Sequence, residues 1–135
     1  MERMSVSNNW RKAVGMIGES IATQYLQRKG FKIIERNFRK PYGEIDIIAE
    51  FGNVVRFVEV KTVSRESLPD VSREMQDYRP EEMVHEAKLR KVARTAELYM
   101  NNLGDMRDYQ IDVVGVFLDQ TNRKARCRLF EQVLW

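Results

Sequence analysis

The chain has 135 residues, of which 32% are charged, with a formal net charge of +3, and this suits one domain with a core of its own. A lone cysteine, Cys127, excludes a disulfide framework and indicates a reducing compartment. No apolar run is long enough for a membrane span or a signal peptide. We therefore expect a cytoplasmic protein with a mildly basic surface, a charge that is weak evidence for a nucleic-acid partner.

The first 29 residues are predicted to form a flexible tail and one amphipathic helix. Residues 1–9 are polar and aperiodic, whereas apolar residues recur at three- and four-residue steps across 10–29, before Gly30. Glu19 lies at the border of this apolar stripe. From there its carboxylate could reach a neighbouring site or point into water.

The next segment, 31–37, has the apolar bulk of a strand. Arg36, Arg39 and Lys40 fall at its end, just before a strongly patterned pair of strands. These basic groups either arrive close to the acidic residues described next or belong to a solvated loop.

Residues 43–61 are predicted to form a β-hairpin, because two β-branched runs flank Gly52 and Asn53, which tolerate the positive φ of a tight turn. With these two as the loop, Asp46 faces Glu59; a turn one residue earlier would slide the partners without changing faces. Since side chains alternate along a strand, two sets are expected on opposite faces. They are Glu44, Asp46, Glu59 and Lys61 on one, and Ile45, Ile47, Val58 and Val60 on the other.

The acidic face of this hairpin is costly unless a cation lies on it, since facing like charges are destabilising. Oxygen ligands without a nearby His or Cys suit magnesium or manganese. Lys61, one pleat beyond Glu59, could then hold a water or stabilise charge on a phosphate. The alternative is a solvated face on which Glu44 pairs with Lys61.

The rest of the chain is predicted to contain a long loop, a second helix and two strands. Residues 63–80 have no clean period and are expected to form a mobile loop at the border of the site. An amphipathic helix at 81–101 is followed by strands at 108–118 and 125–135. Asp112, inside the first of these strands, is expected to meet a backbone or basic partner. This order gives a single α/β or α+β domain over 10–135, with a mixed central sheet flanked by helices.

Asp46, Glu59, one apolar residue and then Lys61 resemble the motif of the PD-(D/E)xK nuclease superfamily. Four segments narrow the resemblance to the small bacterial YraN-like family, which is regarded as similar to archaeal Holliday junction resolvases. They are Gly18-Glu19, Arg36-Asn37-Phe38-Arg39, Gly43 to Ile48, and Phe57 to Thr62. The resemblance covers 10–62 closely and 88–116 loosely, and it is lost between 63 and 82, where this chain is longer and more polar.

The resemblance implies a restriction-endonuclease-like core and a metal-dependent endonuclease acting on structured or branched nucleic acid, DNA rather than RNA. Asp46 and Glu59 would bind magnesium or manganese, with the Val60 carbonyl in the inner shell and Glu19 completing the acidic cluster. Lys61 would position the attacking water. Phosphate contacts are expected from Arg36, Arg39, Lys40, Arg65 and Lys88. We also expect this protein to form a homodimer, because the resolvases that it resembles work as pairs. The alternative is a nucleic-acid-binding or scaffolding protein that keeps the fold without turnover.

Overall fold

The computed structural model describes residues 3–65 and 79–134, of which 3–11, 65, 80 and 81 are described by their backbone alone. Within these ranges the chain forms one α+β domain around a single sheet in which the strands follow chain order. The strands are β1 (Lys32–Lys40), β2 (Gly43–Phe51), β3 (Val54–Arg65), β4 (Tyr109–Asp119) and β5 (Lys124–Leu134). Only β3 and β4 are parallel among the pairs described, so the sheet is mixed, as the sequence predicted.

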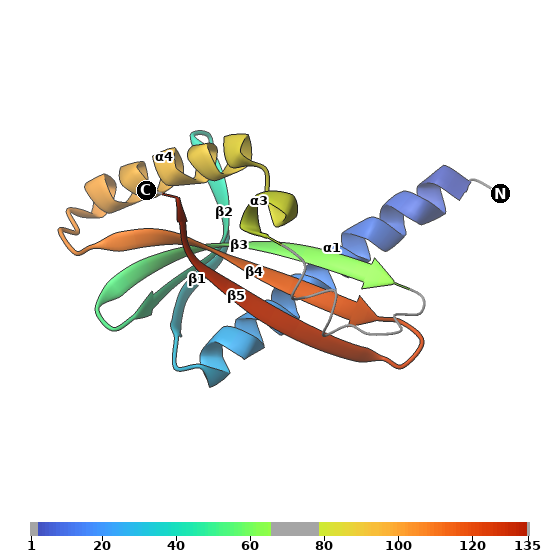
Figure 1. The fold of residues 1–135 in the computed structure, drawn as a ribbon. Coiled ribbons are helices and arrows are strands. Elements are labelled where there is room, and N and C mark those ends of the chain that lie inside the picture. Colours follow the sequence, from blue (N-terminus) through green and yellow to red (C-terminus); the bar gives the residue numbers. More distant parts are fainter. Residues whose placement is uncertain (1–2, 66–78, 135) are drawn as a thin grey trace.

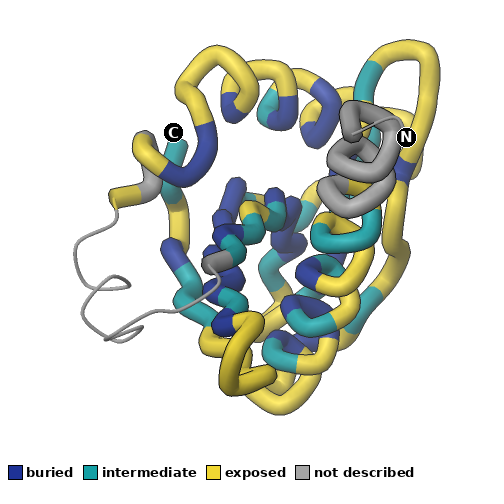
Figure 2. The backbone as a smooth tube through the Cα atoms, turned by 90° about the vertical axis from the view of Figure 1, so that its right-hand side faces the viewer, coloured by how far each residue is buried: buried dark blue, intermediate teal, exposed yellow. Residues whose placement is uncertain are grey.

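Two helices cover the two faces of this sheet (Figure 1). The helix α1 (Arg3–Arg28) packs Ala22 and Leu26 on one face. The helix α4 (Glu86–Leu103) packs Leu89, Val92, Ala96 and Met100 on the other. Figure 2 shows that the buried residues lie on the sides of the helices and strands that face each other. The strands contribute alternately to the two halves of the core, because successive side chains point to opposite faces.

The β2–β3 hairpin has the turn that the sequence predicted. Gly52 and Asn53 have φ values of 58° and 65°, as a tight primed turn requires. The ladder pairs Phe51 with Val54 and continues to Ile47 opposite Val58. The register with Gly52 and Asn53 as the loop residues is therefore confirmed.

The predicted second helix is wrong in one respect, because it is two helices, α3 (Pro80–Met83) and α4. Between them His85 has an extended backbone, with φ −62° and ψ 142°. Met83 and Val84 are 3% and 6% exposed. The break allows both side chains to enter the core, and this burial offsets the lost helical hydrogen bonds.

Two predicted boundaries were also wrong. The helix α1 begins at Arg3 rather than at Trp10, so its start lies inside the segment that the sequence assigned to a tail. The strand β3 continues to Arg65, because residues 63–65 pair with β4 instead of opening the predicted loop. The rest of that loop, residues 66–78, lies outside the described residues.

Candidate active site

The strands β2 and β3 stop pairing at the place where the sequence predicted the acidic face. The last pair of their ladder is Ile47 with Val58. Beyond this pair, β2 is paired only with β1, and β3 is paired only with β4, among the described strands. Asn37 of β1 has φ 53°, an irregularity beside Asp46 in the β1–β2 ladder. A gap therefore opens in the sheet next to Asp46.

Side-chain alternation also breaks at Asp46. Ile45 packs in the core half that contains Phe57, on the α4 side, whereas Ile47 packs with Val58 on the α1 side. The prediction that Ile45 shares a face with Val58 is therefore wrong. Two residues that should share a face lie on opposite faces, because the β2 backbone turns between them, and the turn directs the Asp46 side chain into the gap.

The Asp46 carboxylate replaces a strand partner for β3. Its Oδ2 accepts the Val60 N–H at 2.9 Å, just past the end of the ladder, where β2 no longer supplies a carbonyl. A buried backbone donor needs an acceptor, so this bond stabilises the open strand end. It also fixes one Asp46 oxygen beside β3 and anchors the candidate metal ligand to the strand that carries Glu59 and Lys61.

Glu59 is an acid inside the core, 2% exposed. The Lys88 ammonium reaches it from α4, with Nζ 3.2 Å from Oε2. Burial and the charge of Asp46 raise the pKa of Glu59 to about 7, although Lys88 favours the ionised form. Asp46 and Glu59 thus converge as the sequence predicted, and their repulsion is part of the electrostatics of the site.

Glu19 approaches Asp46 from the α1 side of the sheet. Its Oε1 is buried without a hydrogen-bond partner in the described structure, and the Arg36 Nε lies 3.6 Å away at ion-pair distance. Burial, and then the charge of Asp46, raise the pKa of Glu19. Asp46 therefore lies within electrostatic reach of one carboxylate from each side of the sheet.

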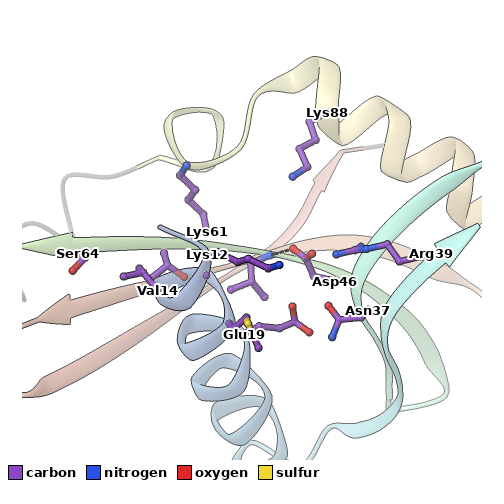
Figure 3. Close-up of a pocket in the computed structure, with 13 residues that line it drawn as sticks. Lys12, Val14, Glu19, Asn37, Arg39, Asp46, Lys61, Ser64 and Lys88 are labelled. Atoms are coloured by element: carbon purple, nitrogen blue, oxygen red, sulfur yellow. Dashed lines mark hydrogen bonds between the residues drawn. The ribbon is translucent and has the colours of Figure 1, made fainter. Parts of the chain in front are cut away.

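Glu19, Asp46, Val60 and Lys88 border an open cleft of about 820 Å³ (Figure 3), whereas Glu59 is not among the described residues that line it. Its lining includes Lys12, Glu19, Asn37, Arg39, Asp46, Val60, Lys61 and Lys88. Lys61 is exposed, and in Figure 3 its side chain points away from Asp46. The cleft combines acidic and basic side chains, the composition that a site for an anionic substrate and a cation requires.

Sequence comparison identifies the family to which these motifs belong. Residues 18–116 match the model of the uncharacterised protein family UPF0102. The chain belongs to this family. It is the YraN-like group that the sequence motifs resemble.

Other members of UPF0102 are similar along most of their length. A UPF0102 protein of Fervidobacterium nodosum is 36% identical over 132 residues, covering 96% of this chain and 87% of the relative. A UPF0102 protein of Caldanaerobacter subterraneus is 38% identical over 111 residues, covering 81% and 83%. One of Campylobacter jejuni is 36% identical over 100 residues, covering 74% and 80%. The three alignments thus span most of this chain and most of each relative.

In this member of UPF0102, the basic residues predicted to contact phosphates have different surroundings. Arg36 pairs with Glu19, and Arg39 pairs with Glu44 at 3.7 Å. Lys40 lies over the Phe38 ring, 5.9 Å from its centroid. Lys88 is held by Glu59, and the Arg65 side chain lies outside the described residues. Arg39 and Lys88 line the cleft and Arg36 adjoins it through Glu19.

The oxygen ligands fit a hard divalent cation in type, because Asp46 and Glu59 converge and repel each other. Within the described ranges there is no group of three or more His, Cys, Asp or Glu side chains placed to hold a metal ion. Metal binding by Asp46, Glu59 and the Val60 carbonyl stays a prediction.

The described helices include none long and apolar enough to cross a membrane.

Sequence reasoning assigned no site role to several residues that line the cleft, Lys12 and Asn37 among them. Lys12 lies two helical turns before Glu19, so the spacing places both on one side of α1, a signal that could have been read. Asn37 carried a weaker signal, since Asn is one of the few residues that adopts a positive φ readily.

Proposed function

We propose that this protein is a metal-dependent endonuclease that hydrolyses phosphodiester bonds in nucleic acid. The observation that carries the proposal is the convergence of Asp46 and Glu59 where β2 and β3 separate, with the Val60 N–H holding Asp46 at 2.9 Å. Lys61 follows on the same strand and lines the cleft. An acid pair beside a lysine in an open cleft is suited to bind a cation and an anionic substrate together.

Magnesium or manganese would bind Asp46 and Glu59, with the Val60 carbonyl as a further oxygen ligand. A cation there would relieve the repulsion that raises the pKa of Glu59. When bound, such an ion polarises a phosphoryl oxygen and lowers the pKa of water.

The protein's own groups would orient the reactants. Lys61 would hold the attacking water or stabilise charge on the phosphate. Glu19, whose buried Oε1 has no hydrogen-bond partner in the described structure, would accept a hydrogen bond from a water at the α1 side of Asp46. Arg36, Arg39 and Lys88 would leave their present acidic partners to contact phosphates. Lys40 and Arg65 are proposed as further phosphate contacts.

The expected substrate is structured or branched DNA, by the resemblance to resolvases, and the same resemblance supports a homodimer acting on a branched substrate. The lone Cys127 supports a cytoplasmic location, because disulfides are rare in a reducing compartment.

A second candidate function, nucleic-acid binding without turnover, is favoured by one contact. Lys88 satisfies Glu59 with a 3.2 Å ion pair, so the acid pair has a counter-ion from the chain itself. A protein that kept this arrangement while binding nucleic acid would retain the fold and the basic groups but would not need a metal.

The test is a cleavage panel of labelled four-way, flapped, duplex and single-stranded DNA and RNA, each with Mg²⁺, Mn²⁺ or EDTA. The proposal expects at least one substrate to be cut with metal and none with EDTA. Asp46→Asn, prepared in parallel, should cut none. If the protein binds these substrates but cuts none of them with either metal, the result would support nucleic-acid binding without turnover instead.

A further inference from the structure

A second hollow, of about 370 Å³, lies beside the cleft between the turn that joins β1 to β2 and the helix α4. Tyr42 and Glu44 line it from the turn and the start of β2. Lys88, Lys91 and Arg94 line it from α4. Its volume falls in the range of small-ligand sites.

The cations of this hollow are spaced along one side of α4. Lys88, Lys91 and Arg94 follow at three-residue steps, so each lies about 4.5 Å further along the helix axis. Arg90, on the same helix, pairs with Glu86 at 2.9 Å. Lys91 and Arg94 have no acidic partner in the part of the chain that the structure describes. These two side chains are therefore available to an anion, whereas Arg90 is engaged.

The one acid of the hollow is already partly neutralised. The Arg39 Nη1 lies 3.7 Å from Oε2 of Glu44. The net charge of the hollow is positive. Lys91 and Arg94 each carry a positive charge, whereas the charge of Lys88 is largely balanced by Glu59. Charge complementarity favours a phosphate group as the occupant.

Tyr42 of the turn also lines this hollow, and its hydroxyl accepts a hydrogen bond from the Asn102 amide at 3.4 Å. Tyr42 is 38% exposed, and its ring is tilted by 56° against Phe38. The turn packs closely on α4, because a Cβ at Gly43 would overlap the Thr95 hydroxyl. That hydroxyl donates to the Lys91 carbonyl at 2.9 Å, and its oxygen lies 3.5 Å from the Tyr42 carbonyl. A partly exposed, held ring beside phosphate-binding cations is suited to stack on a nucleic-acid base.

Lys88 lines both the cleft and the hollow, so the two are adjacent along α4. We propose that the hollow binds one nucleotide of a single strand, with its phosphate on Lys91 and Arg94 and its unpaired base against Tyr42. This deepens and rests on the proposed function of the cleft, where the neighbouring phosphate of the same strand would lie. The base must be unpaired because a paired base is already stacked on its neighbours, so the substrate is single-stranded on this side.

The experiment measures binding of a labelled single strand and a duplex of equal length in EDTA, over a series of salt concentrations. The variants are the double change Lys91→Ala with Arg94→Ala, and Tyr42→Ala. Their matched controls are Arg90→Ala, on the same helix with an acidic partner, and Tyr42→Phe, which keeps the ring. Circular dichroism and thermal unfolding confirm that each variant is folded.

The double variant should lower the salt slope for the single strand by about 0.7 units, since its two side chains share one phosphate and each neutralised phosphate contributes about 0.7. Arg90→Ala should not change it. Tyr42→Ala should weaken single-strand binding about five-fold or more and leave duplex binding unchanged, and Tyr42→Phe should bind like the wild type. An unchanged slope in the double variant, or equal weakening of strand and duplex by Tyr42→Ala, would overturn the proposal, as would a wild type that binds no single strand.

The readouts separate this inference from the catalytic proposal, because EDTA binding requires no metal and no turnover. If the hollow variants behave as expected and no substrate is cut with metal, the nuclease proposal fails and the hollow stands. If metal-dependent cleavage depends on Asp46 while the hollow variants bind like the wild type, the proposal for the hollow is wrong and the nuclease proposal is unaffected.

Discussion

The ammonium of Lys88 lies 3.2 Å from Oε2 of Glu59, although the two side chains are 62% and 2% exposed. An exposed residue of α4 thus provides the counter-ion of an acid buried in β3. Burial by itself lowers the pKa of Lys88, but the charge and hydrogen bond of Glu59, together with the charges of Asp46 and Glu44, raise it overall. The pKa of Glu59 is also raised, by burial and by Asp46. Two predictions follow from this pair.

The first concerns pH and stability. Burial and Asp46 raise the pKa of Glu59 from 4.5 to about 7. Between these values the folded protein keeps a proton that the unfolded chain has lost, so the free energy of unfolding falls as pH rises and levels off above about 7. The contribution is on the order of 3 kcal/mol. Glu59→Gln has no such proton, so urea denaturation in EDTA at pH 5 to 8 should show a decline in the wild type that the variant lacks. Parallel curves for the two proteins would contradict the shifted pKa.

The second concerns metal binding. A divalent cation on Glu59 and Asp46 would lie close to the Lys88 ammonium, and the two positive charges repel. Lys88→Met should therefore bind Mg²⁺ several-fold more tightly than the wild type, measured by titration calorimetry at pH 9 so that Glu59 is ionised. Lys91→Met, a matched change on the same helix, should leave the affinity unaltered. Equal or weaker binding by Lys88→Met would show that Lys88 and the metal do not compete.

A third prediction concerns the charge network at the other end of the sheet. The Arg56 Nη1 donates to Oδ2 of the fully buried Asp112 at 2.8 Å and to the Glu131 carboxylate at 3.0 Å. Asp112 thus meets the basic partner that the sequence predicted. Asp112→Ala should cost about 3–5 kcal/mol of stability, because it leaves Arg56 buried with its main partner gone. Glu131→Ala, whose side chain is 54% exposed, should cost less than about 1 kcal/mol in the same urea titration. Similar costs for both variants would contradict the dominant role of the buried pair.

A fourth prediction compares two glycines of α1. A Cβ at Gly18 would overlap the Thr62 hydroxyl of β3, whereas a Cβ at Gly15 would have nothing within 4 Å. Gly18→Ala should therefore destabilise the fold by about 1–3 kcal/mol through overpacking. Gly15→Ala should be neutral or stabilising by up to about 1 kcal/mol, because alanine favours a helix. Thermal unfolding of the two variants is the measurement, and a stable Gly18→Ala protein would show that α1 and β3 are not packed this closely.

The features that depend on short-range rules could be predicted from the sequence. Gly52 and Asn53 fixed the hairpin register, because a tight turn needs residues that adopt positive φ. The same register brought the strand segments that carry Asp46 and Glu59 near each other, although the ladder itself ends at Ile47 and Val58. The apolar spacing of α4 also predicted which side of that helix is buried, since that spacing follows helical periodicity. In α1 the predicted stripe is buried at Ala22 and Leu26 but not at Ile17, which is 46% exposed.

The features that depend on distant partners could not be predicted. The turn of β2 at Asp46 arises because β2 leaves β3 and continues with β1, which no local pattern encodes. The break at His85 depends on space in the core for Met83 and Val84. The pairing of Lys88 with Glu59 requires α4 to cross the sheet above β3, and the sequence does not specify where a helix crosses a sheet.

The central claim is that Asp46 and Lys61 act in catalysis rather than in binding. It is tested most directly by measuring binding and cleavage of the same labelled branched DNA by the wild type, Asp46→Asn and Lys61→Ala. Asp46→Asn keeps a side-chain oxygen that can accept the Val60 N–H, and Lys61 is exposed, so both variants should fold. The account predicts that affinity in EDTA stays within a few-fold of the wild type while metal-dependent cleavage is lost in both. Cleavage at the wild-type rate by both variants would contradict it.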